Sequence, residues 1–239
     1  MSYHIYTTDG IILKRKPFGE ANVLLHILTE DLGLILASAT SARSAHSKLR
    51  LALQEYSYCS ASLIKAKNGW KVTNVVEKNN FYFDIDNIDI SNDSDVSSRV
   101  SDKKTEMART ALDTTLTTNK YHRVMAQIVF TILQMIQGEA PHPEIFQTVL
   151  TGFQFLTKTK VARTALATES DENIFDISNF EILAVLRILY HLGYVVSDSD
   201  TGKFLEKPND WDENLLNQIS LKKRKVVSLI NKALQASQL

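Results

Sequence analysis

A short acidic segment separates two parts of the sequence that differ in hydrophobic periodicity. Residues 81–102 hold six aspartates against Arg99, and residues 91–98 contain almost no apolar side chain. Before this segment apolar residues alternate as in strands, whereas from Thr105 onward they recur every three or four residues, as in helices. The sequence therefore predicts a β-rich domain over residues 1–80, an acidic Ser/Asp connector over 81–104 and a helical domain over 105–239.

The overall charge balance hides an uneven distribution. The chain has 239 residues, and its 27 Lys and Arg equal its 27 Asp and Glu. Residues 1–80 carry ten basic against six acidic side chains, a net charge of +4, whereas residues 81–102 carry −5. The neutral total is therefore no argument against a polyanionic partner of the N-terminal domain.

The composition and the N-terminus indicate the class of protein and its cellular compartment. A hydrophobic content of 44% and a charged content of 23% are typical of a globular protein. Cys59 is the single cysteine, which excludes an internal disulfide and a zinc site built from several cysteines. The N-terminus lacks a basic region followed by an apolar stretch, and no apolar run approaches the ~20 residues that span a bilayer. We expect a cytoplasmic protein.

Five strands are predicted in the first 80 residues. The turn at residues 30–33 joins two β-rich runs, 22–29 and 34–38, as a hairpin. A second turn at residues 66–69 precedes another run that starts at Trp70. Five short strands suffice for a small closed barrel of the oligonucleotide-binding (OB) type, although SH3-like barrels give much the same pattern.

The C-terminal part has the pattern of a helical bundle. Ser178 and Glu181 form a capping box at the start of a helix that ends at Gly193. Asn209 and Ser220 are candidate N-caps of two final helices. With six helices expected, the fold class is α+β multidomain: an N-terminal five-stranded OB-type barrel followed by a C-terminal all-α helical bundle.

Catalytic and metal-binding motifs are missing. The glycines form no nucleotide-binding pattern, and none of the six histidines pairs with another ligand four residues away. A calcium loop around Asp93 and Asp95 would lack its glycine and its bidentate glutamate. Cys59 has no basic neighbour and is interpreted as a buried structural thiol. Nothing in the sequence asks for an enzyme, and we expect no cofactor and no metal.

Two basic clusters in the N-terminal domain are candidates for phosphate contact. Basic side chains neutralise phosphates, and hydroxyl groups bind their oxygens. The proposed nucleic-acid-binding residues are Lys14, Arg15, Lys16, Arg43, Ser44, His46, Ser47, Lys48 and Arg50. Possible base-stacking residues are Phe18, Tyr56 and Trp70. The alternative interpretation is a solvated basic face with aromatic residues in the core.

Four segments of the sequence resemble the RecO family of bacterial DNA-repair proteins. In the N-terminal domain, residues 11–22 (IILKRKPFGEAN) are similar to the family's opening, and residues 28–33 (LTEDLG) to its hairpin. Residues 42–50 (ARSAHSKLR) with 53–56 (LQEY) resemble its basic loop and next strand. In the helical part, residues 180–194 (FEILAVLRILYHLGY) resemble a helix of the family. The four segments occur in the family's order.

The resemblance implies a non-enzymatic role in DNA repair and recombination. It implies an OB-type barrel that binds single- and double-stranded DNA, anneals complementary strands and helps load RecA onto strands coated by single-stranded DNA-binding protein (SSB). RecR and the C-terminal tail of SSB would be partners. Arg43, Ser47 and Arg50 match the family's basic loop, and residues 14–16 lie at the exit of its first strand.

The sequence departs from the family pattern at three places. Many members carry four zinc-binding cysteines in the helical domain, which a chain with only Cys59 cannot supply. Ser41 stands where a glycine is common, and Ser178 and Asn179 stand where most members have an arginine before Phe-Glu. If that arginine grips the SSB tail, the contact shifts here to other basic residues. The candidates for tail binding are Lys120, Arg123 and Arg187.

Two other functions fit the same residues. A protein–protein adaptor would use the barrel to bind a partner and the bundle to dimerise. An RNA-binding factor would use the same barrel surface as a DNA-binding protein. Annealing of complementary strands and the preference between RNA and DNA distinguish these hypotheses from DNA repair.

Overall fold

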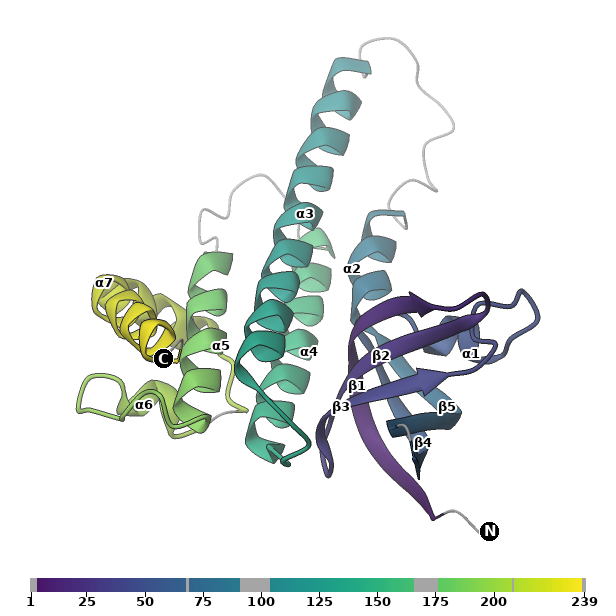
Figure 1. Cartoon of the computed structure of the whole chain (residues 1–239). Helices are drawn as coiled ribbons and strands as arrows, with labels where there is room; N and C mark the ends of the chain where they lie inside the picture. Colours follow the sequence, from purple (N-terminus) through teal and green to yellow (C-terminus); the bar gives the residue numbers. More distant parts are fainter. Residues whose placement is uncertain (1–3, 68, 91–103, 166–175, 208, 238–239) are drawn as a thin grey trace.

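A five-stranded barrel packs against a group of helices in the computed structural model, which describes residues 4–67, 69–90, 104–165, 176–207 and 209–237 (Figure 1). The strands are β1 (Ile5–Phe18), β2 (Asn22–Thr29), β3 (Gly33–Ala39), β4 (Ser57–Ala66) and β5 (Gly69–Asn80). The helices are α1 (Leu49–Ala52), α2 (Phe81–Ile90), α3 (Lys104–Met135), α4 (Pro143–Ala165), α5 (Ile177–His191), α6 (Gly202–Leu205) and α7 (Glu213–Ala236).

The barrel closes in the order β1-β2-β3-β5-β4. β1 is long enough to serve two neighbours: its first half pairs with β4 up to Ile11, and its second half pairs with β2 up to Phe18. β3 and β5 meet in parallel through only two residue pairs, which start at Ala37 and Trp70. The predicted five strands and the hairpin between β2 and β3 are confirmed.

The two faces of β1 serve two hydrophobic cores, beside an irregularity in the strand. The register with β2 shifts between Ile12 and Lys14, as in a β-bulge. Ile12 points into the barrel, whereas Ile11 and Leu13 belong to the core that the helices form. Three consecutive residues are thereby fully buried, and β1 joins the barrel to the helical domain.

The loop between α3 and α4 fastens the barrel at two points. Gly33, with a φ of +74°, lies so close to Ala140 that a Cβ atom at residue 33 would be 2.0 Å from its carbonyl oxygen. Glu139 accepts hydrogen bonds from Lys65 Nζ at 2.7 Å and from Trp70 Nε1 at 2.9 Å. These contacts fix the barrel against the helices.

The start of α5 differs from the sequence expectation, whereas its end agrees with it. Asp176, not Ser178, is the N-cap of α5, and its carboxylate accepts the Ser178 backbone N–H at 2.9 Å. A carboxylate two residues upstream competes with the serine hydroxyl for the same free amides. The expected end at Gly193 is confirmed, since α5 ends at His191 and Gly193 has a φ of +81°.

The prediction of two final helices is wrong. A single helix, α7, runs through residue 220 and begins after Asp212 rather than Asn209. Ser220 is exposed inside this helix, where the neighbouring Leu and Lys residues favour helix and a solvent-facing serine costs little. Among the described residues, none of the helices is long and apolar enough to cross a membrane.

Helix α2 occupies the first part of the predicted acidic connector. Phe81 and Ile85 are fully buried in the core formed with the helical domain. Asn80 caps the helix, because its Oδ1 accepts the backbone N–H groups of Tyr82 and Phe83. Residues 91–103, which include the other three aspartates of the connector, lie outside the described residues. The predicted domain boundaries therefore stay a prediction.

Candidate nucleic-acid interface

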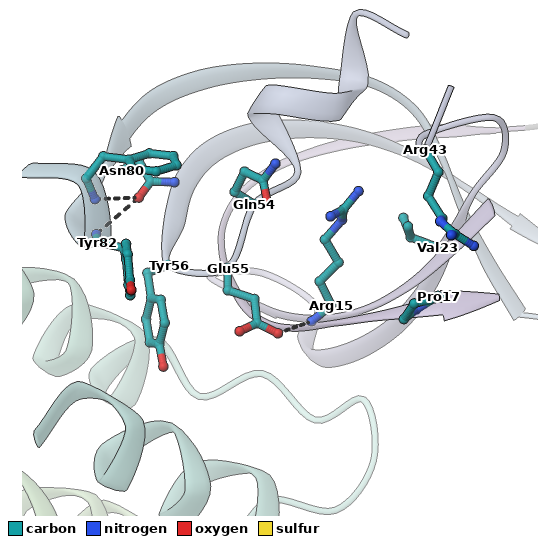
Figure 2. Close-up of a pocket in the computed structure, with 10 residues that line it drawn as sticks. Arg15, Pro17, Val23, Arg43, Gln54, Glu55, Tyr56, Asn80 and Tyr82 are labelled. Atoms are coloured by element: carbon teal, nitrogen blue, oxygen red, sulfur yellow. Dashed lines mark hydrogen bonds between the residues drawn. The ribbon is translucent and has the colours of Figure 1, made fainter. Parts of the chain in front are cut away.

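A groove of about 510 Å³ opens where the barrel meets the start of α2. Its walls come from β1, β2, the segment between β3 and β4, and the first turn of α2 (Figure 2). The lining residues are Arg15, Pro17, Val23, Arg43, Gln54, Glu55, Tyr56, Asn80, Tyr82 and Phe83. They combine cations, aromatic rings and amides in one concave surface.

The cations and the aromatic residues lie at opposite ends of the groove. Arg15 and Arg43 lie at one end, and Tyr56 and Tyr82 at the other (Figure 2). Arg43 is oriented by its backbone N–H, which binds Ala21 O at 2.9 Å, and by Nη1, which lies 3.3 Å from Gly19 O. The remaining guanidinium donors of Arg43 stay exposed to solvent.

The aromatic end is built by α2 and by the residue that precedes β4. Tyr82 and Phe83 are 37% and 47% exposed, which is unusual for large aromatic side chains. Tyr82 stacks on His122 of α3 with ring centroids 4.0 Å apart, and Tyr56 lies 6.0 Å from Tyr82 in a nearly parallel orientation. Burial, followed by the charge of Glu55, raises the pKa of Tyr56 to about 12, so its phenol stays neutral.

Backbone strain marks both ends of the basic loop. Among the described residues, Ser41 and Tyr56 are the two non-glycine residues with positive φ, at 53° and 64°. Such conformations cost energy and persist where the surrounding structure imposes them. Ser41 thus keeps the left-handed conformation that a glycine would adopt freely, and Asn22 Oδ1 holds its backbone N–H at 2.9 Å.

The predicted basic residues are placed on one part of the barrel. Lys14 and Lys16 are exposed on β1, and Arg15 between them is half-buried and lines the groove. In the loop and α1, the exposed residues are Arg43, Ser44, His46, Lys48 and Arg50, and Ser47 is half-buried. None of these side chains forms an ion pair with any residue that the structure describes. The structure brings Arg15 and Arg43 to the groove and leaves the other basic residues around it.

His26 reports the positive field of this surface. It lies on β2 opposite Lys14, and its Nδ1 is buried without a hydrogen-bond partner. Burial, followed by the charges of Lys16 and Lys14, lowers the pKa of His26 below its usual value. Because no carboxylate of the described residues pairs with these lysines, the surface attracts anions.

The three predicted stacking residues differ in position. Phe18 is 56% exposed at the end of β1, and Tyr56 lines the groove. The prediction for Trp70 is wrong, because its indole is only 4% exposed, donates to Glu139 and meets the ring edge of Tyr6. A tryptophan at the start of a strand packs as core when a helical domain covers that end of the barrel.

The predicted tail-binding residues are also divided. Lys120 and Arg123 are exposed one turn apart on α3. The prediction that Arg187 contacts the tail at the surface is wrong, because its side chain is fully buried. It donates to the carbonyls of Phe204 and Asp210 and lies over the Trp211 ring. Burial lowers the pKa of Arg187 to about 10, and its role is structural.

Sequence reasoning missed the residues that α2 and its cap contribute. Glu55, Asn80, Tyr82 and Phe83 were not among the candidates, and the last two fell in the predicted connector. The signal that could have found them is the run Phe-Tyr-Phe at residues 81–83, which is out of place in a solvated acidic linker.

The single cysteine has no part in the site. Cys59 is fully buried in the barrel interior, and burial raises the pKa of its thiol to about 12. The interpretation as a structural thiol is confirmed. Within the described ranges, no group of three or more His, Cys, Asp or Glu side chains could hold a metal ion.

The architecture defines the chain as a protein with an N-terminal closed β-barrel that packs against a helical domain. Residues 1–78, which cover the barrel almost completely, match the family described as "Recombination protein O N terminal". The N-terminal domain of this chain is thus similar to that of the RecO family.

Several proteins named DNA repair protein RecO are similar to parts of this chain. The protein from Dehalococcoides mccartyi is 41% identical over 64 residues, which are 27% of this chain and 25% of that protein. The protein from Synechococcus elongatus is 52% identical over 44 residues, 18% and 16% of the two chains. The protein from Alkaliphilus metalliredigens is 33% identical over 75 residues, 31% and 30% of the two chains. The similarity thus spans less than a third of these relatives' length.

Proposed function

We propose that this protein acts in DNA repair as a non-enzymatic DNA-binding factor whose barrel is of the OB type. The observation that carries the proposal is the groove in which two arginines without ion-pair partners face exposed aromatic rings. The match of residues 1–78 to the N-terminal domain of the RecO family and the names of the similar proteins support the repair role.

The physical argument concerns single strands first. Arg15 and Arg43, with the exposed cations around them, supply the contacts that neutralise phosphates. Tyr82 and Phe83 offer ring surface to an unstacked base, and stacking of this kind tolerates any base. Duplex DNA would use the phosphate contacts of the same surface without the aromatic ones.

The wider proposal follows the resemblance of the chain to RecO. A protein that binds both single and double strands can anneal complementary strands and help load RecA onto strands coated by SSB. RecR and the C-terminal tail of SSB are the proposed protein partners, in the bacterial cytoplasm. With Arg187 buried, Lys120 and Arg123 on α3 are the basic residues left for the acidic tail.

The test is binding and annealing by a charge-reversed variant. Arg43, Lys48 and Arg50 are changed together to glutamate, and binding of a labelled single strand is followed by fluorescence anisotropy across a salt series. We expect wild-type affinity to fall linearly with salt on a logarithmic scale, and the variant to lose binding by about 100-fold or more at low salt.

A matched control separates local contacts from net charge. Lys158, Lys207 and Lys232 are exposed in the helical domain, without an ion pair in the described structure, and their change to glutamate alters the charge equally. This variant should bind nearly as the wild type. Unchanged affinity after reversal in the barrel would exclude the proposed surface, tighter binding to RNA would favour an RNA-binding factor, and failure to anneal bare or SSB-coated strands would exclude the repair mediator.

A further inference from the structure

Glu55 is an unexpected residue for a groove that binds a polyanion. It is the only acidic side chain among the described residues that line the groove. Figure 2 places it between Tyr56 and Arg15, at the junction of the aromatic and the basic ends. A carboxylate there repels phosphate, so it must either weaken binding or contact another part of the ligand.

The strand arrangement explains why Glu55 is held in place. β4 begins at Ser57, so the edge of β1 beyond Ile11 has no strand partner on that side. The backbone of Tyr56 donates to Ile12 O at 2.7 Å, and Glu55 Oε1 accepts the Arg15 backbone N–H at 2.8 Å. The side chain therefore satisfies an open strand edge, which fixes its orientation.

The second carboxylate oxygen of Glu55 is left available. Within the described structure Oε1 makes the hydrogen bond to Arg15, and Oε2 has no hydrogen bond or ion pair. A fixed, negatively charged acceptor favours N–H donors, which the bases offer as exocyclic amino groups or, in thymine and guanine, as a ring N–H. At ring position 4 the two pyrimidines differ. Cytosine presents its N4 amino group, whereas thymine presents O4, which a carboxylate repels.

We propose that the groove binds one unpaired nucleotide and that Glu55 selects a base that carries an amino group, cytosine over thymine. The phosphate lies at the arginine end and the base packs on Tyr82 and Phe83, which brings the base edge to the carboxylate between them. In a duplex the base is stacked on its neighbours and cannot pack on Tyr82 and Phe83, so the selection operates on single strands. The inference rests on the proposed function, because it deepens nucleic-acid binding at the same groove.

The experiment compares two pyrimidine homopolymers of equal length, oligo-deoxycytidine and oligo-deoxythymidine, at mildly alkaline pH, where cytosine is neutral. Binding is measured by fluorescence anisotropy with the full chain. We expect about tenfold tighter binding of the cytidine strand, the effect of one charge-assisted hydrogen bond. Glu55→Gln keeps an oxygen that accepts the Arg15 backbone N–H but adds an amide N–H that donates to thymine O4, so the ratio should fall to near one.

Glu20→Gln is the matched control, because Glu20 is exposed in the turn between β1 and β2 and does not line the groove. It changes the net charge equally and should leave the ratio at its wild-type value. Equal binding of the two strands by the wild type, or a preference that survives Glu55→Gln in a variant with a normal melting curve, would overturn the inference alone. Absence of binding to both strands would instead refute the proposed function.

Discussion

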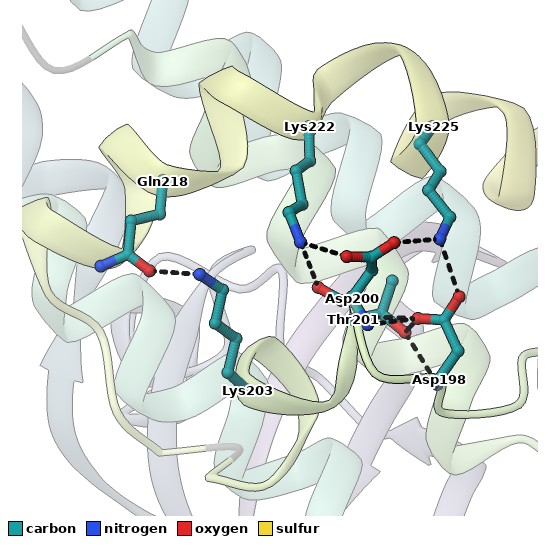
Figure 3. Close-up of polar contacts among 7 residues, drawn as sticks. All are labelled: Asp198, Asp200, Thr201, Lys203, Gln218, Lys222 and Lys225. Atoms are coloured by element: carbon teal, nitrogen blue, oxygen red, sulfur yellow. Dashed lines mark hydrogen bonds and ion pairs between the residues drawn. The ribbon is translucent and has the colours of Figure 1, made fainter.

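Cations in the barrel and cations in the helical domain have different partners. In the helical domain, Lys222 and Lys225 of α7 bind Asp200 at 2.5 and 2.6 Å, and Lys225 also binds Asp198 at 2.9 Å (Figure 3). Lys225 holds the pKa of the Asp198 carboxyl well below its usual range. In the barrel, by contrast, Lys14 and Lys16 pair with no carboxylate of the described residues, and with burial as the larger cause they lower the pKa of His26.

Whether a basic side chain has an ion-pair partner distinguishes structural from ligand-binding cations better than the net charge of a domain does. The ion pairs of α7 join it to the loop that follows α5, and Asp198 also closes that loop through Thr201 (Figure 3). Lys65 and Lys78 of the barrel are also paired, with Glu139 and Asp9. The basic residues at positions 14–16, 43, 48 and 50 form no ion pair within the described structure, so their charge repels in the folded state but favours binding of an anion. The ion-paired lysines of α7 therefore stabilise the fold, whereas the basic residues of β1 and of the basic loop are available to a ligand.

The largest expected effect concerns Arg187, the most deeply structural of these cations. Arg187→Ala removes the bonds to Phe204 O and Asp210 O and opens a cavity beside Trp211. We expect the free energy of unfolding to fall by about 3–5 kcal/mol, measured by urea denaturation. Lys207→Ala, at an exposed position of the same domain, should change it by less than about 0.5 kcal/mol.

Arg187→Ala also tests whether a buried cation of the helical domain contributes to DNA binding. Below its melting temperature Arg187→Ala should bind single-stranded DNA as tightly as the wild type, because Arg187 lies in the core of the helical domain. A large loss of affinity in the folded variant would show that the helical domain contributes a cation to the ligand, against the comparison.

The second prediction sharpens the role of the groove arginines. Arg15→Gln and Arg43→Gln each remove one phosphate contact and keep part of the side chain's hydrogen bonding. We expect each change to weaken single-strand binding by about 1–2 kcal/mol and to lower the slope of log affinity against log salt by about 0.7. Titration of affinity over a salt series measures both quantities. An unchanged slope would mean that the arginine does not touch phosphate.

The fold followed from the sequence further than the site did. Alternation and turns predicted the five strands, because each signal is local, and Gly193 and the hairpin before Gly33 lie where they were expected. The groove depends on tertiary contacts: α2 places Tyr82 beside Tyr56 only because Phe81 packs on Phe153 of α4. Trp70 and Arg187 failed as candidates for the same reason, since a partner distant in sequence buries each of them.

The third prediction uses His26 as a probe of the uncompensated field. Its pKa is lowered by burial and by Lys16 and Lys14, so neutralising those lysines must raise it. An oligonucleotide bound to this face, or Lys16→Gln, should raise the pKa of His26, which is followed by NMR titration of the imidazole. The pKa of His191, which lies in the helical domain, should not move. A constant His26 pKa on binding would place the strand elsewhere.

The smallest expected effect concerns the strained loop that carries the unpaired cations. Ser41→Gly relieves a left-handed conformation that a side chain disfavours, at the cost of a more flexible unfolded chain. We expect the free energy of unfolding to rise by about 0.5–1 kcal/mol in urea denaturation, whereas Ser44→Gly, at an ordinary φ in the same loop, should lower it by about 0.5 kcal/mol. DNA affinity of Ser41→Gly should stay within about twofold of the wild type, because the contacts of Asn22 and Arg43 keep the loop in place. A clear loss of affinity with gained stability would show that the strain itself holds the arginine toward the ligand.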